Sequence, residues 1–423
     1  MSKIKKAKKV FYKILLKTGM IKQFSLFAVT DFQNIHIVPY EDLLDLPFGR
    51  SDHKGGPIWS VWNDTNNLRH KRDEYVDVRP TLPSTEDIYE EERELFWCGA
   101  IAEHYDQQSD KISGHFGHQV ADFMSRIPAY KEYEKTTGKQ GYYCFAVRNN
   151  SLITQIKDTP SYFQQILRWF EIDPTRVVIV NKPILAKKLL VTPQLECLNP
   201  NGPVLNDRYL SLLNEYVNSR LGVAITNDKT LYISRSAIKG GELAGESYLE
   251  RFLEKNGVVV IHPEKLPLTE QIKMYREAKH LIFLEGSSLH CLQFLGKSDA
   301  KVYVINRRRG SNLMRSSLES RFPRVEYLDI TDLVHGLSAA GKKARYDGIS
   351  ILNKNLLFKF FADVKFDSTF WEQEEFEKIQ KSHLKIWYQR KEKAQVSGHK
   401  NSLILIDNMF HELGIKVEDL KKY

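Results

Sequence analysis

Two loops in the second half of the chain carry residue types that bind phosphate. The first reads Ser-Arg-Ser at residues 234–236, and the second reads Glu-Gly-Ser-Ser at residues 285–288. An arginine can clamp a pyrophosphate with paired hydrogen bonds, and a glycine lets backbone N–H groups approach a phosphate closely. Each loop alone could have a purely structural role instead of binding phosphate, because serine also caps helices and arginine also forms surface ion pairs. Together the two loops favour a diphosphate site.

A further stretch, residues 114–127, places three reactive groups at helical spacing. His118, Asp122 and Arg126 follow one another four residues apart, which puts them along one face of a helix. An imidazole, with an ordinary pKa of about 6.5, can take a proton near neutral pH, and Asp122 could orient it. Two alternatives stay open: Asp122 is the base and His118 a phosphate ligand, or the residues form an ion-pair ladder that only shapes the helix.

His115 precedes His118 by three residues, a spacing that can also suggest a metal. A zinc site needs at least three protein ligands, and the sequence offers no third one nearby. The sequence therefore predicts no metal site here.

The two phosphate-type loops follow short apolar runs that alternate with helix-like segments. The expected strands are residues 230–234, 258–261, 280–284 and 301–305, and the expected helices are residues 246–256, residues 269–279 and one that begins near Leu289. This alternation indicates parallel βαβ units. Ligands bind outside the carboxyl ends of the strands in such sheets, which is where both loops lie.

The remaining segments give a coarser pattern. Strands are expected at residues 94–100, 141–148, 176–180 and 325–328, helices at 162–170, 331–340, 370–393 and 402–413, and a linker at 193–206. Residues 27–82 read as irregular, and their aromatic residues Trp59, Trp62 and Tyr75 either line an acceptor groove or pack beneath loops. The run Arg-Arg-Arg-Gly at residues 307–310 follows a strand end and could aid an anionic donor, but a solvated basic turn is the preferred interpretation.

Length, charge and cysteine content narrow the class of protein. A chain of 423 residues favours two domains. The formal net charge is +9, but eight lysines and no acidic residue lie within residues 1–22, so the rest of the chain is nearly neutral and does not resemble a nucleic-acid-binding surface.

The four cysteines are widely spaced, which argues against a disulfide framework and favours reduced thiols in the cytosol. No apolar run is long enough to span a bilayer, and no signal peptide is evident.

The first 22 residues combine an apolar stripe with lysines at the other positions. This spacing predicts a basic amphipathic helix, which suits an anionic membrane surface. The alternative is a solvated tail without a partner.

Several of these segments resemble glycosyltransferase family 61. The donor-domain pattern of that family is matched by Tyr-Ile-Ser-Arg-Ser at 232–236, by Pro-Glu-Lys-Leu at 263–266 with Glu-Gln-Ile at 270–272, and by Glu-Gly-Ser-Ser-Leu-His at 285–290. Its amino-domain signature resembles residues 114–127, where His118, Asp122, Arg126 and Ile127 match. The family often places further arginines and an Asn-Glu after the first motif. Here residues 239–241 are Lys-Gly-Gly and residues 245–246 are Gly-Glu.

The resemblance implies a GT-B fold, with two Rossmann-like α/β domains that face each other across a cleft and helices at the carboxyl end. The expected division is a basic tail (1–25), an N-terminal acceptor-binding domain (26–200) and a C-terminal donor domain with the closing helices (201–423).

The resemblance also implies an inverting glycosyltransferase that takes its sugar from a nucleotide-diphosphate sugar, with UDP as the expected nucleotide. Its acceptor would be a surface polysaccharide or a lipid-linked glycan, the tail would reach the inner face of the cytoplasmic membrane, and no cofactor is expected. The expected catalytic residues are His118 and Asp122; the donor residues are Arg235, Ser236, Lys239, Glu264, Gly286, Ser287 and Ser288; and the acceptor or cleft residues are His115 and Arg126.

The sequence contains no Asp-x-Asp, so a metal held by carboxylates on the donor phosphates is not indicated, and cationic side chains would neutralise the leaving diphosphate. The alternative function is a non-catalytic relative that binds a glycan or a nucleotide.

Overall fold

The computed structural model describes residues 29–46, 50–60, 79–84, 88–106, 111–196, 205–225, 227–337, 343–395 and 402–421. The chain forms two compact units, the N-unit (Met1–Leu198 with Asp207–Leu212) and the C-unit (Asn199–Asn206 with Leu213–Tyr423). The helix α5 (Asp207–Leu221) contributes to both. Both units combine helices with sheets, so the predicted α/β class is confirmed.

A six-stranded mixed sheet forms the centre of the N-unit. Its spatial order is β2 (Arg50–Pro57), β1 (Thr30–Leu46), β8 (Ile184–Val191), β3 (Tyr89–Ala100), β6 (Tyr142–Ala146) and β7 (Val177–Val180). The last four strands are parallel to one another, whereas β1 is antiparallel to both β2 and β8. The sheet is therefore Rossmann-like only in its parallel half.

The strands β1 and β2 correct the prediction that residues 27–82 are irregular. Asn34, at a left-handed φ of 53°, and Pro39 interrupt the apolar alternation along β1. The strand forms because β8, about 150 residues further along the chain, pairs with its other edge. Of the three aromatic residues proposed for a groove, Trp59 packs against Phe32 with ring centroids 4.9 Å apart, and the other two lie outside the described residues.

The predicted helix over residues 114–127 is not continuous. The short strands β4 (Glu103–Asp106) and β5 (Lys111–Gly114) form a hairpin that leads into α2 (Phe116–His118), a π-helical turn at Gln119–Phe123, and then α3 (Ile127–Thr137). The predicted helix at 162–170 is α4 (Ser161–Trp169), which buries Phe163 against Phe145 of β6.

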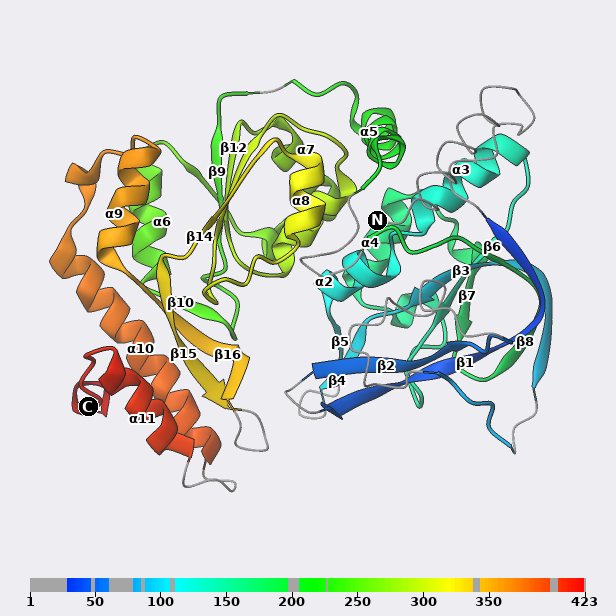
Figure 1. Cartoon of the computed structure of the whole chain (residues 1–423), viewed down its shortest axis with the longest axis horizontal. Helices are drawn as coiled ribbons and strands as arrows, with labels where there is room; N and C mark the ends of the chain where they lie inside the picture. Colours follow the sequence, from blue (N-terminus) through cyan, green and yellow to red (C-terminus); the bar gives the residue numbers. More distant parts are fainter. Residues whose placement is uncertain are drawn as a thin grey trace, which may run out of the picture. The chain divides into compact units, whose positions relative to one another are not determined.

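A five-stranded parallel sheet forms the centre of the C-unit (Figure 1). Its spatial order is β11 (Val259–Ile261), β9 (Thr230–Ile233), β12 (His280–Leu284), β13 (Lys301–Ile305) and β14 (Arg324–Leu328). All five strands were predicted to within two residues at either end.

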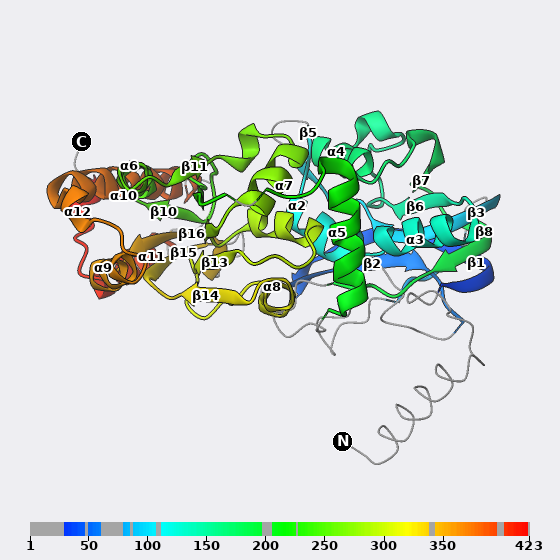
Figure 2. The same cartoon turned by 90° about the horizontal axis from the view of Figure 1, so that it is seen from above.

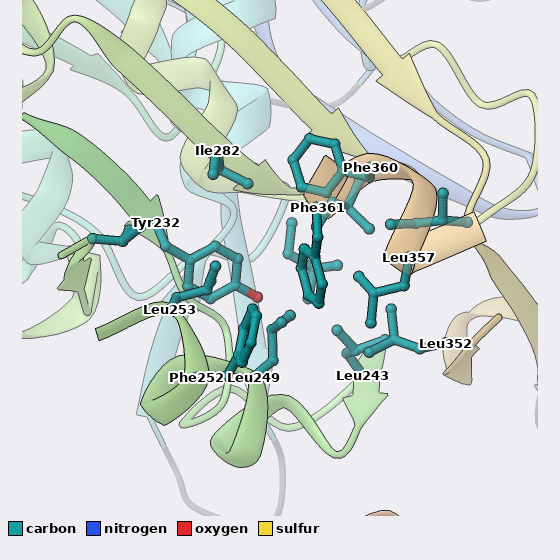
Figure 3. Packing of buried hydrophobic residues seen from close by; sticks show 14 of the residues in the cluster. Tyr232, Leu243, Leu249, Phe252, Leu253, Ile282, Leu352, Leu357, Phe360 and Phe361 are labelled. Atoms are coloured by element: carbon teal, nitrogen blue, oxygen red, sulfur yellow. The ribbon is translucent and has the colours of Figure 1, made fainter. Parts of the chain in front are cut away.

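Helices cover both faces of this sheet. On one face, α6 (Glu246–Lys255) and α9 (Lys354–Asp363) pack against Tyr232 and Ile282, as Figure 3 shows. On the other face, α7 (Leu268–Glu277) packs Tyr275 against Phe283, with ring centroids 5.5 Å apart. Alternate residues of β12 thus serve the two faces, so the buried strand reads as a continuous apolar run.

A second sheet of the C-unit, of order β10-β16-β15, corrects another prediction. Residues 331–340 were expected to be helical, but Thr331–Leu337 is the strand β15. It pairs antiparallel with β16 (Lys343–Leu352), and β10 (Glu242–Ala244) pairs with the other edge of β16. The β-branched residues Thr331 and Val334 suit this pairing better than a helix.

Helices close the carboxyl end of the C-unit, as predicted. They are α10 (Gln373–Gln395), α11 (Ser402–Glu412) and α12 (Glu418–Lys421). In Figures 1 and 2, α10 runs along α6 and β10. The ion pair between Arg390 of α10 and Glu242 of β10 fixes this contact.

Three of the four cysteines lie in the described part of the chain, and all three are buried free thiols: Cys98 on β3, Cys144 on β6 and Cys291 in the C-unit. Burial raises the pKa of each thiol. Among the described helices, none has the length and apolar character that crossing a membrane requires.

Candidate functional site

The C-unit sheet contains a topological switch point between β9 and β12. The chain leaves β9 towards β11 on one side, returns to β12 on the other side of β9, and continues outward through β13 and β14. In open parallel sheets, the crevice at the carboxyl ends of the two strands flanking such a point is the usual ligand site. Arg235 follows β9 there, and Gly286 follows β12.

The side chain of Arg235 lies directly against Gly286. A β-carbon built on Gly286 would be 2.3 Å from Nη1 of Arg235, so no other residue fits at position 286 without moving the guanidinium. Arg235 is 7% exposed, and its Nη2 donates to the carbonyl oxygen of Gly240 at 3.2 Å. Its buried Nε has no hydrogen-bond partner. A buried guanidinium with an unused donor is suited to bind an anion.

Glu246, at the start of α6, holds the loop that carries Arg235. Its Oε1 accepts hydrogen bonds from the backbone N–H of Arg235 at 2.8 Å, from the hydroxyl of Tyr232 at 2.9 Å and from Oγ of Ser234 at 3.2 Å. Burial raises the pKa of Glu246 to about 7, although these hydrogen bonds act in the opposite direction. The charge on this carboxyl group therefore changes near neutral pH.

The second loop presents hydroxyl groups beside the guanidinium. Ser287 and Ser288 begin a 3-10 helix, Ser287–Phe294, in place of the α-helix expected from Leu289. Both are half-buried, and the buried Oγ of Ser288 has no hydrogen-bond partner. This hydroxyl is thus a second unused polar group at the switch point.

A third loop, after β13, brings two arginines to the same edge of the sheet. The carboxylate of Glu285, which is fully buried, accepts from the backbone N–H groups of Arg307 (2.9 Å) and Arg308 (3.1 Å) and forms an ion pair with the Arg308 side chain. Burial alone would raise the pKa of Glu285, but Arg308 and Arg307 hold it below its usual value. Arg307 is itself buried, so the prediction of a solvated basic turn is wrong for this residue. Only Arg309, with 64% of its side chain exposed, fits that description among the three.

The other predicted donor residues follow β9 and β11 and are less buried than Arg235. Ser236 is exposed, and its Oγ lies 3.2 Å from Oγ of Ser234. Lys239 is exposed and, with Arg235, lines a cavity of about 310 Å³ between the 235–243 loop and α10. Glu264 follows β11, where its carboxylate lies 3.7 Å from Nδ1 of His262.

The predicted catalytic pair is in contact within the N-unit. Nδ1 of His118 lies 2.8 Å from Oδ2 of Asp122. The His118 side chain is 21% exposed and that of Asp122 only 2%, so the imidazole is the member of the pair that reaches the surface. A proton on Nδ1, donated to the carboxylate, leaves Nε2 as the basic nitrogen. The pair can therefore act as a general base with an orienting carboxylate.

His115 serves as the N-cap of α2. Its Nδ1 accepts from the backbone N–H of His118 at 3.2 Å, and the two imidazole rings lie with centroids 4.3 Å apart. It is exposed, so its ring also stays accessible. Within the described ranges, no three His, Cys, Asp or Glu side chains gather closely enough to hold a metal ion.

Arg126 lies beyond a break in the helix that was predicted to carry the triplet. The π-helical turn and the turn after it change the helical phase between Asp122 and residue 126. The Arg126 side chain is fully buried, and its Nε donates to the carbonyl oxygen of Thr192 at 3.1 Å. Burial lowers the pKa of this guanidinium. The hydrogen bond connects the start of α3 to Thr192, the residue after β8, and the buried guanidinium is not accessible to an acceptor.

In the sequence, Arg307 stands out only as part of a basic run that could aid an anionic donor, and nothing indicates the role of Glu285. The signal for a basic site is the run of three arginines at residues 307–309, which begins directly after Asn306 at the end of a predicted strand. Nothing local indicated that a buried carboxylate from the preceding strand would draw one of them inward.

A protein-family model matches part of the chain. The model of the family described as Glycosyltransferase 61 matches residues 116–305, which include His118, Asp122, Arg235 and Gly286. No curated protein sequence matches the chain. Residues 116–305 thus form a glycosyltransferase family 61 domain, and the protein is a glycosyltransferase.

Proposed function

We propose that the protein is an inverting glycosyltransferase of the GT-B type, whose C-unit binds a UDP-sugar and whose N-unit binds the acceptor. The observation that carries the proposal is the buried Arg235, which lies against Gly286 at the switch point with an unused Nε. A diphosphate fits this position, because its oxygens can accept from the guanidinium and from the unpartnered hydroxyl of Ser288. The cavity beside Arg235 falls within the roughly 300–1,000 Å³ range of small-molecule sites.

The proposed reaction is a single displacement. The acceptor hydroxyl gives its proton to Nε2 of His118, and its oxygen bonds to the anomeric carbon of the sugar. The bond from that carbon to the diphosphate oxygen breaks, and the diphosphate leaves with the electron pair. Asp122 stabilises the imidazolium, and Arg235 neutralises the leaving group. Because cationic side chains neutralise the leaving group in this reaction, activity should persist when EDTA removes metal ions.

The acceptor is proposed to be a surface polysaccharide or a lipid-linked glycan on the inner face of the cytoplasmic membrane. The basic stretch at residues 1–22, which lies outside the described residues, supports this proposal through its lysine content.

The test is to incubate purified protein with a panel of nucleotide sugars and to measure the nucleoside diphosphate that is released. Release of UDP from one UDP-sugar, increased by a glycan acceptor, is the expected result. An NMR spectrum of the product then shows whether the anomeric configuration is inverted. Binding of UDP-sugars without any turnover would instead favour a glycan- or nucleotide-binding relative.

A further inference from the structure

Arg307 is buried, although one of its side-chain donors has no hydrogen-bond partner. It follows β13 and is 6% exposed, and its Nε donates to the carbonyl oxygen of Glu285 at 2.6 Å. Its backbone carbonyl accepts from Oγ of Ser350 at 3.1 Å. These bonds hold the backbone and Nε of Arg307, but its buried Nη1 has no hydrogen-bond partner. An unsatisfied buried donor costs about 1–3 kcal/mol, more for a charged group, unless a ligand satisfies it.

The loop that carries Arg235 also encloses Arg307. A β-carbon on Gly241 would lie 1.8 Å from Nη1 of Arg307, and Gly241 has a left-handed φ of 65°. The neighbouring Gly240 accepts the hydrogen bond from Nη2 of Arg235. The two guanidinium groups therefore contact adjacent glycines of one loop, and a larger side chain at Gly241 would displace Arg307.

The charges around these two residues do not balance. Burial, and then the charge of Arg235, lower the pKa of Arg307 to about 10. Arg308 already has an ion pair with Glu285. The remaining carboxylate, Glu246, has a pKa of about 7 and so is only partly ionised near neutral pH. Positive charges outnumber negative ones in a largely buried cluster, and an anion would remove the repulsion.

We propose that Arg235 and Arg307 together bind the donor diphosphate, and that Arg308 stays paired with Glu285 and does not contact it. This inference rests on the proposed function, because it takes the nucleotide sugar as the ligand. Further arginines often follow the first motif in the family that the chain resembles, whereas residues 239–241 here are Lys-Gly-Gly. The second guanidinium is supplied instead from the end of β13, and the two glycines leave room for it.

The experiment measures the affinity of the full chain for UDP, for uridine and for inorganic pyrophosphate by calorimetry. The variants are Arg307→Gln and, as a matched control, Arg309→Gln, whose side chain is exposed and lies 3.7 Å from Asp332. Arg307→Gln should weaken UDP and pyrophosphate binding by roughly tenfold or more and leave uridine binding unchanged. Arg309→Gln should leave all three affinities within about twofold of the parent protein.

A second variant covers the case in which Arg307→Gln does not fold. Arg307→Lys keeps the charge but loses the guanidinium fork, so it should weaken UDP binding by a smaller factor, again without affecting uridine. If either folded variant binds UDP as tightly as the parent protein, Arg307 is not a ligand, and the proposed function still stands through Arg235. If the parent protein binds neither UDP nor pyrophosphate, both proposals fail.

Discussion

Gly286 and Arg235 are so close that a single methyl group on the glycine would lie 2.3 Å from the guanidinium. The φ of Gly286 is 168°, an extended value that any residue can adopt, so the requirement for glycine here comes from space and not from backbone conformation. The loop after β12 thus fixes where the arginine after β9 can be.

Replacement of Arg235 by alanine tests the donor site directly. A charge-assisted hydrogen bond contributes about 1.5–3 kcal/mol, so Arg235→Ala should weaken UDP binding by roughly tenfold or more. Arg251→Ala is the control, because this arginine forms an exposed ion pair with Glu375 on the outside of α6. Calorimetry that gives Arg235→Ala the same UDP affinity as the control would remove Arg235 from the site.

Gly286→Ala should act through Arg235. The added methyl group displaces the guanidinium, so we expect a loss of UDP affinity of similar size to that of Arg235→Ala. In the double variant the two losses should not add, because the methyl group has nothing left to displace. Additive losses in this double-mutant cycle would mean that Gly286 contacts the nucleotide independently.

The catalytic assignment predicts that His118→Ala lowers kcat by roughly 10²–10⁴-fold while the affinity for the donor stays nearly intact. Asp122→Asn should cause a smaller loss, because the carboxylate orients the imidazole and does not itself take the proton. Steady-state kinetics and donor binding on the same preparations provide the measurement. A larger loss in Asp122→Asn would transfer the role of base to the carboxylate, and a His118→Ala enzyme with the parental kcat would contradict both assignments.

Glu246 predicts a pH dependence of stability. Burial raises its folded pKa from 4.5 to about 7, so the folded protein binds more protons than the unfolded chain between these values. The free energy of unfolding should therefore fall as the pH rises from 4.5 to 7 and change no further from this source above pH 7. A shift of this size corresponds to roughly 3 kcal/mol.

Glu246→Gln isolates this contribution. All three hydrogen bonds to the carboxylate reach Oε1, which glutamine retains, so the variant should keep the loop while losing the titration. Urea unfolding of both proteins from pH 4.5 to 7.5 gives the comparison. A difference in unfolding free energy between them that stays constant over this range would show that Glu246 keeps an ordinary pKa.

Deletion of residues 1–22 tests the membrane partner. Each lysine near an anionic surface contributes about 1 kcal/mol, so the truncated protein should no longer sediment with vesicles of anionic lipid. Its activity on a soluble acceptor should be unchanged. Salt-sensitive sedimentation that persists after truncation would place the membrane contact elsewhere in the chain.

The sequence predicts the C-unit sheet well because its strands are short buried runs, each separated from the next by one helix. The residues after β9 and β12 then fall at the ligand edge, and Arg235 and Gly286 can be named without coordinates. The i, i+4 spacing likewise predicts the contact between His118 and Asp122, which the structure confirms.

The predictions that failed have different causes. β1 is held by β8, which lies far along the chain, and β15 is held by β16, which is the next strand; neither pairing leaves a local apolar period. The continuous helix predicted to carry Arg126 is interrupted by a π-helical turn, which the spacing of apolar residues does not reveal. Arg307 resembles a surface residue in the sequence because the carboxylate that holds its backbone belongs to another loop.

The buried thiols give each unit its own internal reporter. Cys98 and Cys144 lie within the N-unit, and Cys291 lies within the C-unit. Burial raises the pKa of all three thiols. An alkylating reagent therefore reaches a reactive thiolate only when the surrounding structure opens. Mass spectrometry of peptides from partly alkylated protein would therefore time the opening of the two units separately. Such labelling in the presence of UDP would show whether the nucleotide protects Cys291 alone or also the thiols of the N-unit.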